Sequence, residues 1–96
     1  MAMAKKLASV HPGEILRDEL EERGLSANAL ARALRVPVNR VTEILNGKRA
    51  ITADTAHRLA RYFGTSAQMW MNLQMDYELD TVDPAKIRRE VLPFAS

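Results

Sequence analysis

Residues 27–45 constrain the fold more than any other part of the sequence, because they predict two short helices separated by an abrupt break. Ser26 is a good N-cap for the first helix, whose apolar residues fall at the spacing of a single helix face. Pro37 disfavours helical geometry at Val36, so the first helix ends there. The second helix is expected over Val38–Leu45. Because so few residues separate the two helices, they must cross at a large angle.

Similar start and stop signals predict five helices along the chain and no strand, so the expected class is all-α. At 96 residues the chain is one domain's worth. We expect a flexible segment over residues 1–10, a helical domain over 11–80 and a tail of unassigned structure over 81–96. The helices are expected from about Pro12 to Gly24, from after Ser26 to Val36, over Val38–Leu45, from after Thr52 to Gly64, and from Thr65 or Ser66 into the acidic stretch 76–83.

Charge is distributed unevenly along the chain, although the net charge is only +2. Residues 32–61 hold seven Lys and Arg residues against two acidic ones, a local charge of +5, and the segments on either side are acidic. One basic face on a polarised molecule is expected of a protein that binds a phosphate backbone, because clustered cations release counterions from nucleic acid. The alternative is that these charges only solvate helix faces.

Two short helices joined this tightly are the arrangement that places a recognition helix in the major groove of DNA. Ala31 is small where the helices must cross closely. Side chains of the second helix that face away from the joint are then free to meet base edges. The candidate base-reading residues are Val38, Asn39, Arg40, Thr42 and Glu43.

Each candidate has a chemical role that base pairs permit. Asn39 can form a bidentate pair with adenine, and Arg40 can do so with guanine or bind phosphate instead. Val38 or Thr42 can pack on a thymine methyl group. Glu43 can accept a hydrogen bond from cytosine, but an acid near phosphates is costly, so pairing with a neighbouring arginine is favoured. A plain solvated face remains the alternative for all five.

Other residues are placed to contact the DNA backbone, which fixes position rather than sequence. The loop after the second helix offers an amide, an unhindered glycine N–H and two cations. Ser26 and Asn28 lie at a helix start, where N–H groups attract phosphate, although simple capping is an equal interpretation for Ser26. The candidate phosphate-binding residues are Ser26, Asn28, Arg35, Asn46, Lys48 and Arg49.

Four segments carry a resemblance to a known family. The run 27–45 followed by Asn46-Gly47-Lys48-Arg49 resembles the Xre or Cro-type helix-turn-helix family of phage-repressor-like proteins. Residues 11–16 (HPGEIL), 43–52 (EILNGKRAIT) and 66–74 (SAQMWMNLQ) are similar to its HigA antitoxin subgroup. The resemblance spans roughly residues 11–80. It implies a five-helix, lambda-repressor-like fold, a homodimer on a palindromic operator, repression of the protein's own promoter, and neutralisation of a HigB-type toxin that cleaves messenger RNA.

Two positions depart from the pattern of the wider family. Ala27 stands where glutamine is common, which puts the usual phosphate contact in doubt, and Arg35 stands where glycine is common in the turn. If that turn residue is left-handed, a residue other than glycine costs about 1 kcal/mol. Arg35 could offset this cost by reaching DNA or a helix terminus.

The last predicted helix carries a large apolar patch for so small a domain. Met69, Trp70, Leu73 and Tyr77 form this patch. The patch is either a lid on the core or a symmetric dimer interface, and partial exposure at the interface is favoured. A two-fold dimer would place two recognition helices about one DNA turn, ~34 Å, apart.

Several classes of function are not expected. Cysteine is absent, and His11 and His57 lack flanking ligands or a nucleophile, so we expect no metal site, no cofactor and no enzyme. No run of residues suits a signal peptide or a membrane span, so a cytoplasmic protein is expected. Two alternatives stay open: a solitary regulator without a toxin partner, and a toxin-binding protein whose DNA binding is vestigial. The acidic segments 19–22 and 76–83 are candidate surfaces for a basic toxin.

Overall fold

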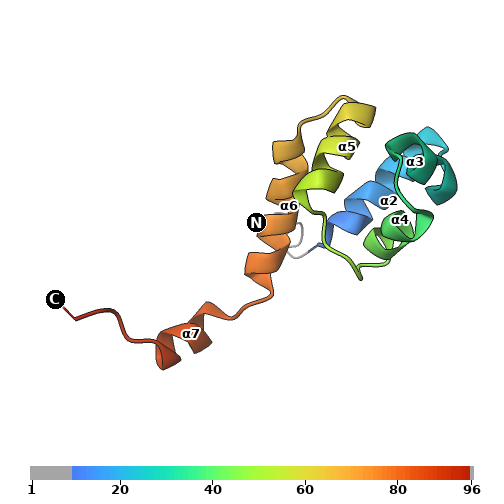
Figure 1. The fold of residues 1–96 in the computed structure, drawn as a ribbon. Coiled ribbons are helices and arrows are strands. Elements are labelled where there is room, and N and C mark those ends of the chain that lie inside the picture. Colours follow the sequence, from blue (N-terminus) through green and yellow to red (C-terminus); the bar gives the residue numbers. More distant parts are fainter. Residues whose placement is uncertain (1–9, 96) are drawn as a thin grey trace.

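The computed structural model describes residues 10–95, and this part of the chain contains six helices and no strand. All but the last form the body of the molecule, from which α7 projects (Figure 1). In chain order the helices are α2 (Pro12–Arg23), α3 (Ala27–Leu34), α4 (Val38–Leu45), α5 (Ala53–Phe63), α6 (Ala67–Asp80) and α7 (Pro84–Glu90). The all-α class and the five expected helices are confirmed, but the count of five is one too few.

The additional helix, α7, lies in the tail, where the sequence predicts no defined structure. Asp83 caps α7 by accepting a hydrogen bond from the Ala85 N–H at 3.0 Å, and Pro84 occupies the first helical position. The helix is only 7 residues long and has no buried side chain, so the spacing of apolar residues could not predict it. The predicted flexible segment 1–10 lies, except for Val10, outside the described residues.

Capping side chains and left-handed glycines set the helix boundaries where the sequence predicted them. Ser26, Thr52 and Ser66 each accept a hydrogen bond from the backbone N–H three residues further on. Gly24 and Gly64 end their helices at φ 65° and 74°. These signals are local, so the limits of α2, α3 and α5 agree with the prediction closely.

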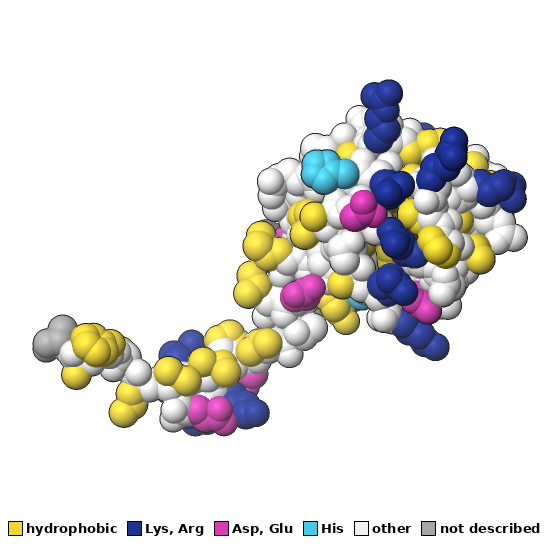
Figure 2. Space-filling model, viewed as in Figure 1, with side chains coloured by type: hydrophobic (Ala, Val, Ile, Leu, Met, Phe, Trp, Pro, Cys, Tyr) yellow, Lys and Arg dark blue, Asp and Glu magenta, His cyan; other side chains and the backbone are white. Residues whose placement is uncertain are grey.

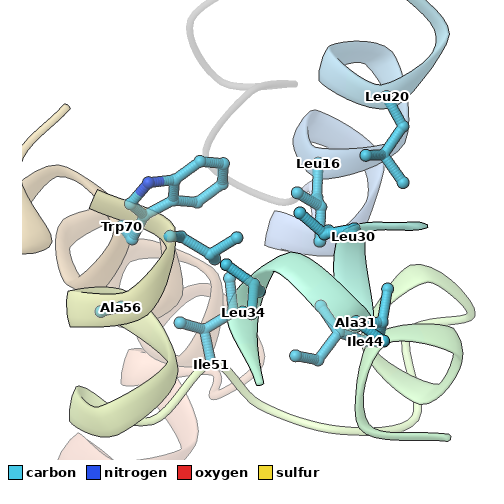
Figure 3. Close-up of a cluster of buried hydrophobic side chains, with 11 residues drawn as sticks. Leu16, Leu20, Leu30, Ala31, Leu34, Ile44, Ile51, Ala56 and Trp70 are labelled. Carbon is cyan, nitrogen blue, oxygen red and sulfur yellow. The ribbon is translucent and has the colours of Figure 1, made fainter. Parts of the chain in front are cut away.

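Side chains from five helices and one loop meet in a single core (Figure 3). The buried apolar side chains are Leu16 and Leu20 of α2, Leu30, Ala31 and Leu34 of α3, Val41 and Ile44 of α4, Ile51 of the loop before α5, Ala56 and Leu59 of α5, and Trp70 of α6. Most of α4's apolar side is therefore used for packing, which fixes the direction of its opposite side.

Trp70 belongs to this core, and the expectation that it is partly exposed at a dimer interface is wrong. Its side chain is 1% exposed. The indole Nε1 donates a hydrogen bond to Thr65 Oγ1 at 3.0 Å, and its ring lies 6.5 Å from that of Phe63. Because the one polar atom of the indole is satisfied locally, α6 can fold back on α5 and bury the whole ring.

Beyond the body, the tail forms an arm with exposed apolar side chains. The described chain measures 54 × 28 × 22 Å, and the long dimension reflects the arm seen in Figure 1. Ile87 is 44% exposed, Val91 61% and Phe94 96%. Among the described residues, no helix has the length and apolar character needed to cross a membrane.

Candidate nucleic-acid interface

The joint between α3 and α4 is built by a left-handed residue followed by a proline. Arg35 has φ 62° and ψ 43°, the left-handed geometry that the departure from glycine raised as a possibility. The Val36 N–H then returns to the Ala31 carbonyl at 3.0 Å, which closes the end of α3. Pro37 starts α4 in extended geometry. This short joint produces the change of direction between the two helices.

Two arginines from other helices anchor this unit, and sequence reasoning missed both roles. Arg58 of α5 donates from Nη1 to the Leu34 carbonyl at 2.9 Å, at the end of α3. Arg17 of α2 donates from Nη2 to the Leu45 carbonyl at 3.0 Å, at the end of α4. Each bond satisfies a carbonyl that the helix itself leaves free. The partners are 24 and 28 residues apart, so no local pattern could reveal them.

The N-terminal end of α2 lies unusually close to α4. A Cβ built on Gly13 would be 1.9 Å from the Ile44 carbonyl oxygen, so only glycine fits. His11 caps α2 through its Nδ1, which accepts from the Gly13 N–H at 2.9 Å. The recognition helix is therefore held against α2 by backbone contact as well as by side chains.

His11 also connects the loop after α4 with α6. Its ring meets the Tyr77 ring edge-on with centroids 4.9 Å apart, so Tyr77 is half-buried here rather than free. Burial lowers the pKa of His11, although the Glu14 carboxylate and a hydrogen bond with the Arg49 backbone act in the opposite direction. The neutral imidazole is thus a structural part beneath the loop 46–50.

The face of α4 that points away from the core carries the predicted base-reading side chains. Val41 and Ile44 are buried, at 2% and 1% exposure. Val38 and Asn39 are exposed, whereas Arg40, Thr42 and Glu43 are half-buried at the surface. The structure therefore brings all five candidates to one outward side of the helix, and their roles at base edges remain a prediction.

The predicted phosphate-binding residues are all exposed, in three places along the chain. Ser26 and Asn28 lie at the start of α3, where the Ser26 hydroxyl already caps the Ala29 N–H at 3.0 Å. Arg35 lies in the turn, and Asn46, Lys48 and Arg49 lie in the loop after α4. Figure 2 shows Lys and Arg side chains gathered on the side of the body formed by α3, α4 and α5, as the charge pattern predicted.

Ion pairs occupy three of the arginines near this surface. Glu43 pairs with Arg49 at 2.7 Å, which confirms the predicted pairing with a neighbouring arginine. Asp54, in the first turn of α5, pairs with Arg58 at 2.8 Å and with Arg40 at 2.9 Å. The hydrogen bond from Arg58, joined by that from Arg40, lowers the pKa of the Asp54 carboxyl. Sequence reasoning did not single out Asp54.

The structure has the features of a helix-turn-helix DNA-binding protein: two short crossed helices, an outward face of polar side chains on the second, and Lys and Arg side chains around it. A helix-turn-helix family model matches residues 16–70. The chain is similar to virulence-associated protein I of Dichelobacter nodosus, with 52% identity over 82 residues that cover 84% of this chain and 76% of that protein.

Solved structures with similar folds indicate a subgroup within this family. The antitoxin HigA of Pseudomonas aeruginosa, solved with the higBA promoter, has a TM-score of 0.84 and 52% identity over 91% of this chain and 99% of that one. An addiction module antidote protein of the HigA family from Coxiella burnetii has a TM-score of 0.84 and 51% identity over 90% and 98%. The chain belongs to the Xre-like helix-turn-helix family, among the HigA-type antitoxins.

Proposed function

We propose that this protein is a sequence-specific DNA-binding repressor of its own promoter and the antitoxin of a toxin–antitoxin pair. The observation that carries the proposal is the outward face of α4, held at its far end by Arg17 and at its start by the closed joint. Such anchoring keeps side chains in the orientation that base recognition needs. The similarity to an antitoxin solved with its promoter supports the same conclusion.

In this proposal the two sets of exposed residues do different work. The side chains of Val38, Asn39, Arg40 and Thr42 read base edges, with Asn39 and Arg40 making the bidentate pairs, while Glu43 pairs with Arg49. Ser26, Asn28, Arg35 and the loop 46–49 position the protein on phosphates. Because its DNA target lies there, we place the protein's action in the cytoplasm.

The experiment is a binding assay on the DNA upstream of the protein's own gene and on random DNA of equal length. Asn39→Ala should remove most of the preference for the upstream site, a loss of about 1–3 kcal/mol for a bidentate contact. Lys48→Ala should weaken binding to both DNAs evenly and reduce its salt dependence. Equal affinity of the wild-type protein for the two DNAs would refute sequence-specific binding.

We further propose that the protein acts as a homodimer through the end of α6 and the arm, rather than through Trp70. Met75, Leu79 and Val82 are 51%, 68% and 52% exposed. With Met71, Gln74 and Glu78 they line an apolar groove on the body. Exposed apolar surface of this kind marks association sites. A two-fold pair would present two α4 helices to a palindromic operator.

Sedimentation analysis of two matched variants tests the dimer. Leu79→Glu puts a charge into the groove and should shift the protein toward monomer, with weaker operator binding. Met69→Glu, on an exposed residue of α6 outside the groove, is the control and should remain dimeric. A monomeric Met69→Glu and a dimeric Leu79→Glu would refute this interface and favour the patch around Met69 that the sequence predicted.

A HigB-type toxin is the proposed protein partner, as membership of the antitoxin family implies. The exposed Glu21 and Glu22 of α2 lie in an acidic segment suited to a basic ribonuclease. Co-expression with the product of the adjacent gene should yield a stable complex and relieve growth arrest. A neighbour without toxicity, or one that does not bind, would leave a solitary regulator instead.

A further inference from the structure

Asp54 is an acidic residue inside an otherwise basic surface, and it joins two helices. Residues 32–61 contain only one other acid, Glu43. The same oxygen of Asp54, Oδ2, accepts from Arg58 Nε at 2.8 Å and from Arg40 Nη1 at 2.9 Å. A carboxylate at this position weakens binding to the DNA phosphates. We therefore expect a different effect of Asp54 on DNA recognition.

Asp54 links Arg40 to Arg58, although its own side chain is 57% exposed. Arg58 donates from Nη1 to the Leu34 carbonyl at 2.9 Å, so its guanidinium spans from the end of α3 to Asp54. Arg40 is also the most enclosed of the ion-paired arginines, with a side chain 31% exposed against 40% for Arg58. The ion pair with Asp54 favours one orientation of the Arg40 guanidinium before DNA binds.

The atoms that Asp54 uses leave the reading edge of Arg40 open. Asp54 takes Nη1, and within residues 10–95 neither Nε nor Nη2 of Arg40 has a protein partner. Those two donors form the side-on fork that matches O6 and N7 of guanine. Arg49 shows the contrast, since Glu43 Oε1 occupies both its Nε, at 2.8 Å, and its Nη2, at 2.7 Å.

We propose that Asp54 is a positioning residue that raises DNA specificity, by presenting the free fork of Arg40 to a guanine and by weakening binding to phosphates alone. The inference rests on the proposed function, in which Arg40 reads a base. An arginine already held in its bound geometry loses less side-chain freedom on binding. The negative charge meanwhile opposes binding that lacks this contact.

The test compares operator and random DNA for the wild type and Asp54→Asn, which keeps the shape and removes the charge. We expect the specificity ratio to fall about 5- to 10-fold, with operator binding weaker and random-DNA binding equal or tighter. Glu19→Gln is the matched control, since Glu19 pairs with Arg23 on α2 at 3.0 Å, and it should change neither affinity. Thermal unfolding confirms that both variants are folded.

A double-mutant cycle separates positioning from a general structural effect. In an Arg40→Ala background, Asp54→Asn should cause no further loss of preference at the base pair that Arg40 reads. An unchanged ratio, parallel losses on both DNAs, or additive effects in the cycle would overturn the inference. Failure of the proposed function is a different result, because the wild-type protein itself would then prefer no operator.

Discussion

The close contact between Gly13 and α4 predicts that an alanine at position 13 destabilises the protein. Gly13→Ala adds a Cβ 1.9 Å from the Ile44 carbonyl oxygen and 2.9 Å from its carbon, where Cβ atoms essentially never come closer than 3.0 Å. The obstacle is backbone rather than a flexible side chain. One of the two helices must therefore move by about 1 Å to remove the overlap.

We expect this displacement to cost about 2–3 kcal/mol of unfolding free energy, in the range of overpacked cores. Alanine is otherwise the better helix former by about 1 kcal/mol. A loss of unfolding free energy in Gly13→Ala would therefore show that the steric overlap outweighs the gain in helix propensity. For a domain of this size the loss corresponds to a fall in Tm of about 10–20 °C. Operator affinity should fall as well, because α4 is displaced.

Thermal and urea unfolding of Gly13→Ala measure the cost. Gly24→Ala is the control, because φ is 65° there and no atom lies within 4 Å of an added Cβ. It should lose only the roughly 1–2 kcal/mol of a left-handed alanine. A Gly13→Ala protein as stable as the wild type would refute the close packing of α2 on α4.

Three further predictions concern single residues. Arg35→Gly should relieve the left-handed strain and leave stability unchanged or higher by up to about 1 kcal/mol, while weakening DNA binding through the lost cation; a loss of stability in urea unfolding would refute it. Because burial lowers the pKa of His11, the unfolded chain takes up the proton first, so stability should fall as the pH drops below about 6.5 and level off below the folded pKa. Urea unfolding of His11→Asn, which keeps a capping side chain, should show a flatter dependence, and an equally steep one would contradict the assignment. Trp70 is the only tryptophan, so acrylamide quenching should stay weak even in monomeric Leu79→Glu, and strong quenching on dissociation would place the ring at the interface after all.

Local signals predicted most of the fold, because caps and breaks act within a few residues. Ser26, Pro37 and Thr52 fixed helix limits that agree with the structure, and the spacing of apolar residues identified the outward face of α4. The short α7 escaped because a helix without a buried side has no apolar periodicity to detect. Trp70 was misjudged because burial depends on how α6 folds over α5, which no local pattern states.

The contacts that anchor α3 and α4 could not be predicted from the sequence, because they join residues far apart in the chain. Arg17 meets Leu45, and Arg58 meets Leu34, through side chains whose partners lie more than twenty residues away. Asp54 reads in the sequence as an ordinary acid in the first turn of a helix. Its contact with Arg40 exists only because the loop after α4 brings the first turn of α5 within reach of the Arg40 side chain.

The central claim is that the outward side of α4 reads bases in the major groove, and protection of guanine N7 from dimethyl sulfate measures this directly. The wild-type protein should protect guanines in two half-sites about one DNA turn apart. Arg40→Ala should lose protection at one guanine in each half-site and keep the rest. Absence of major-groove protection, or a pattern that substitutions in α4 leave unchanged, would contradict the account.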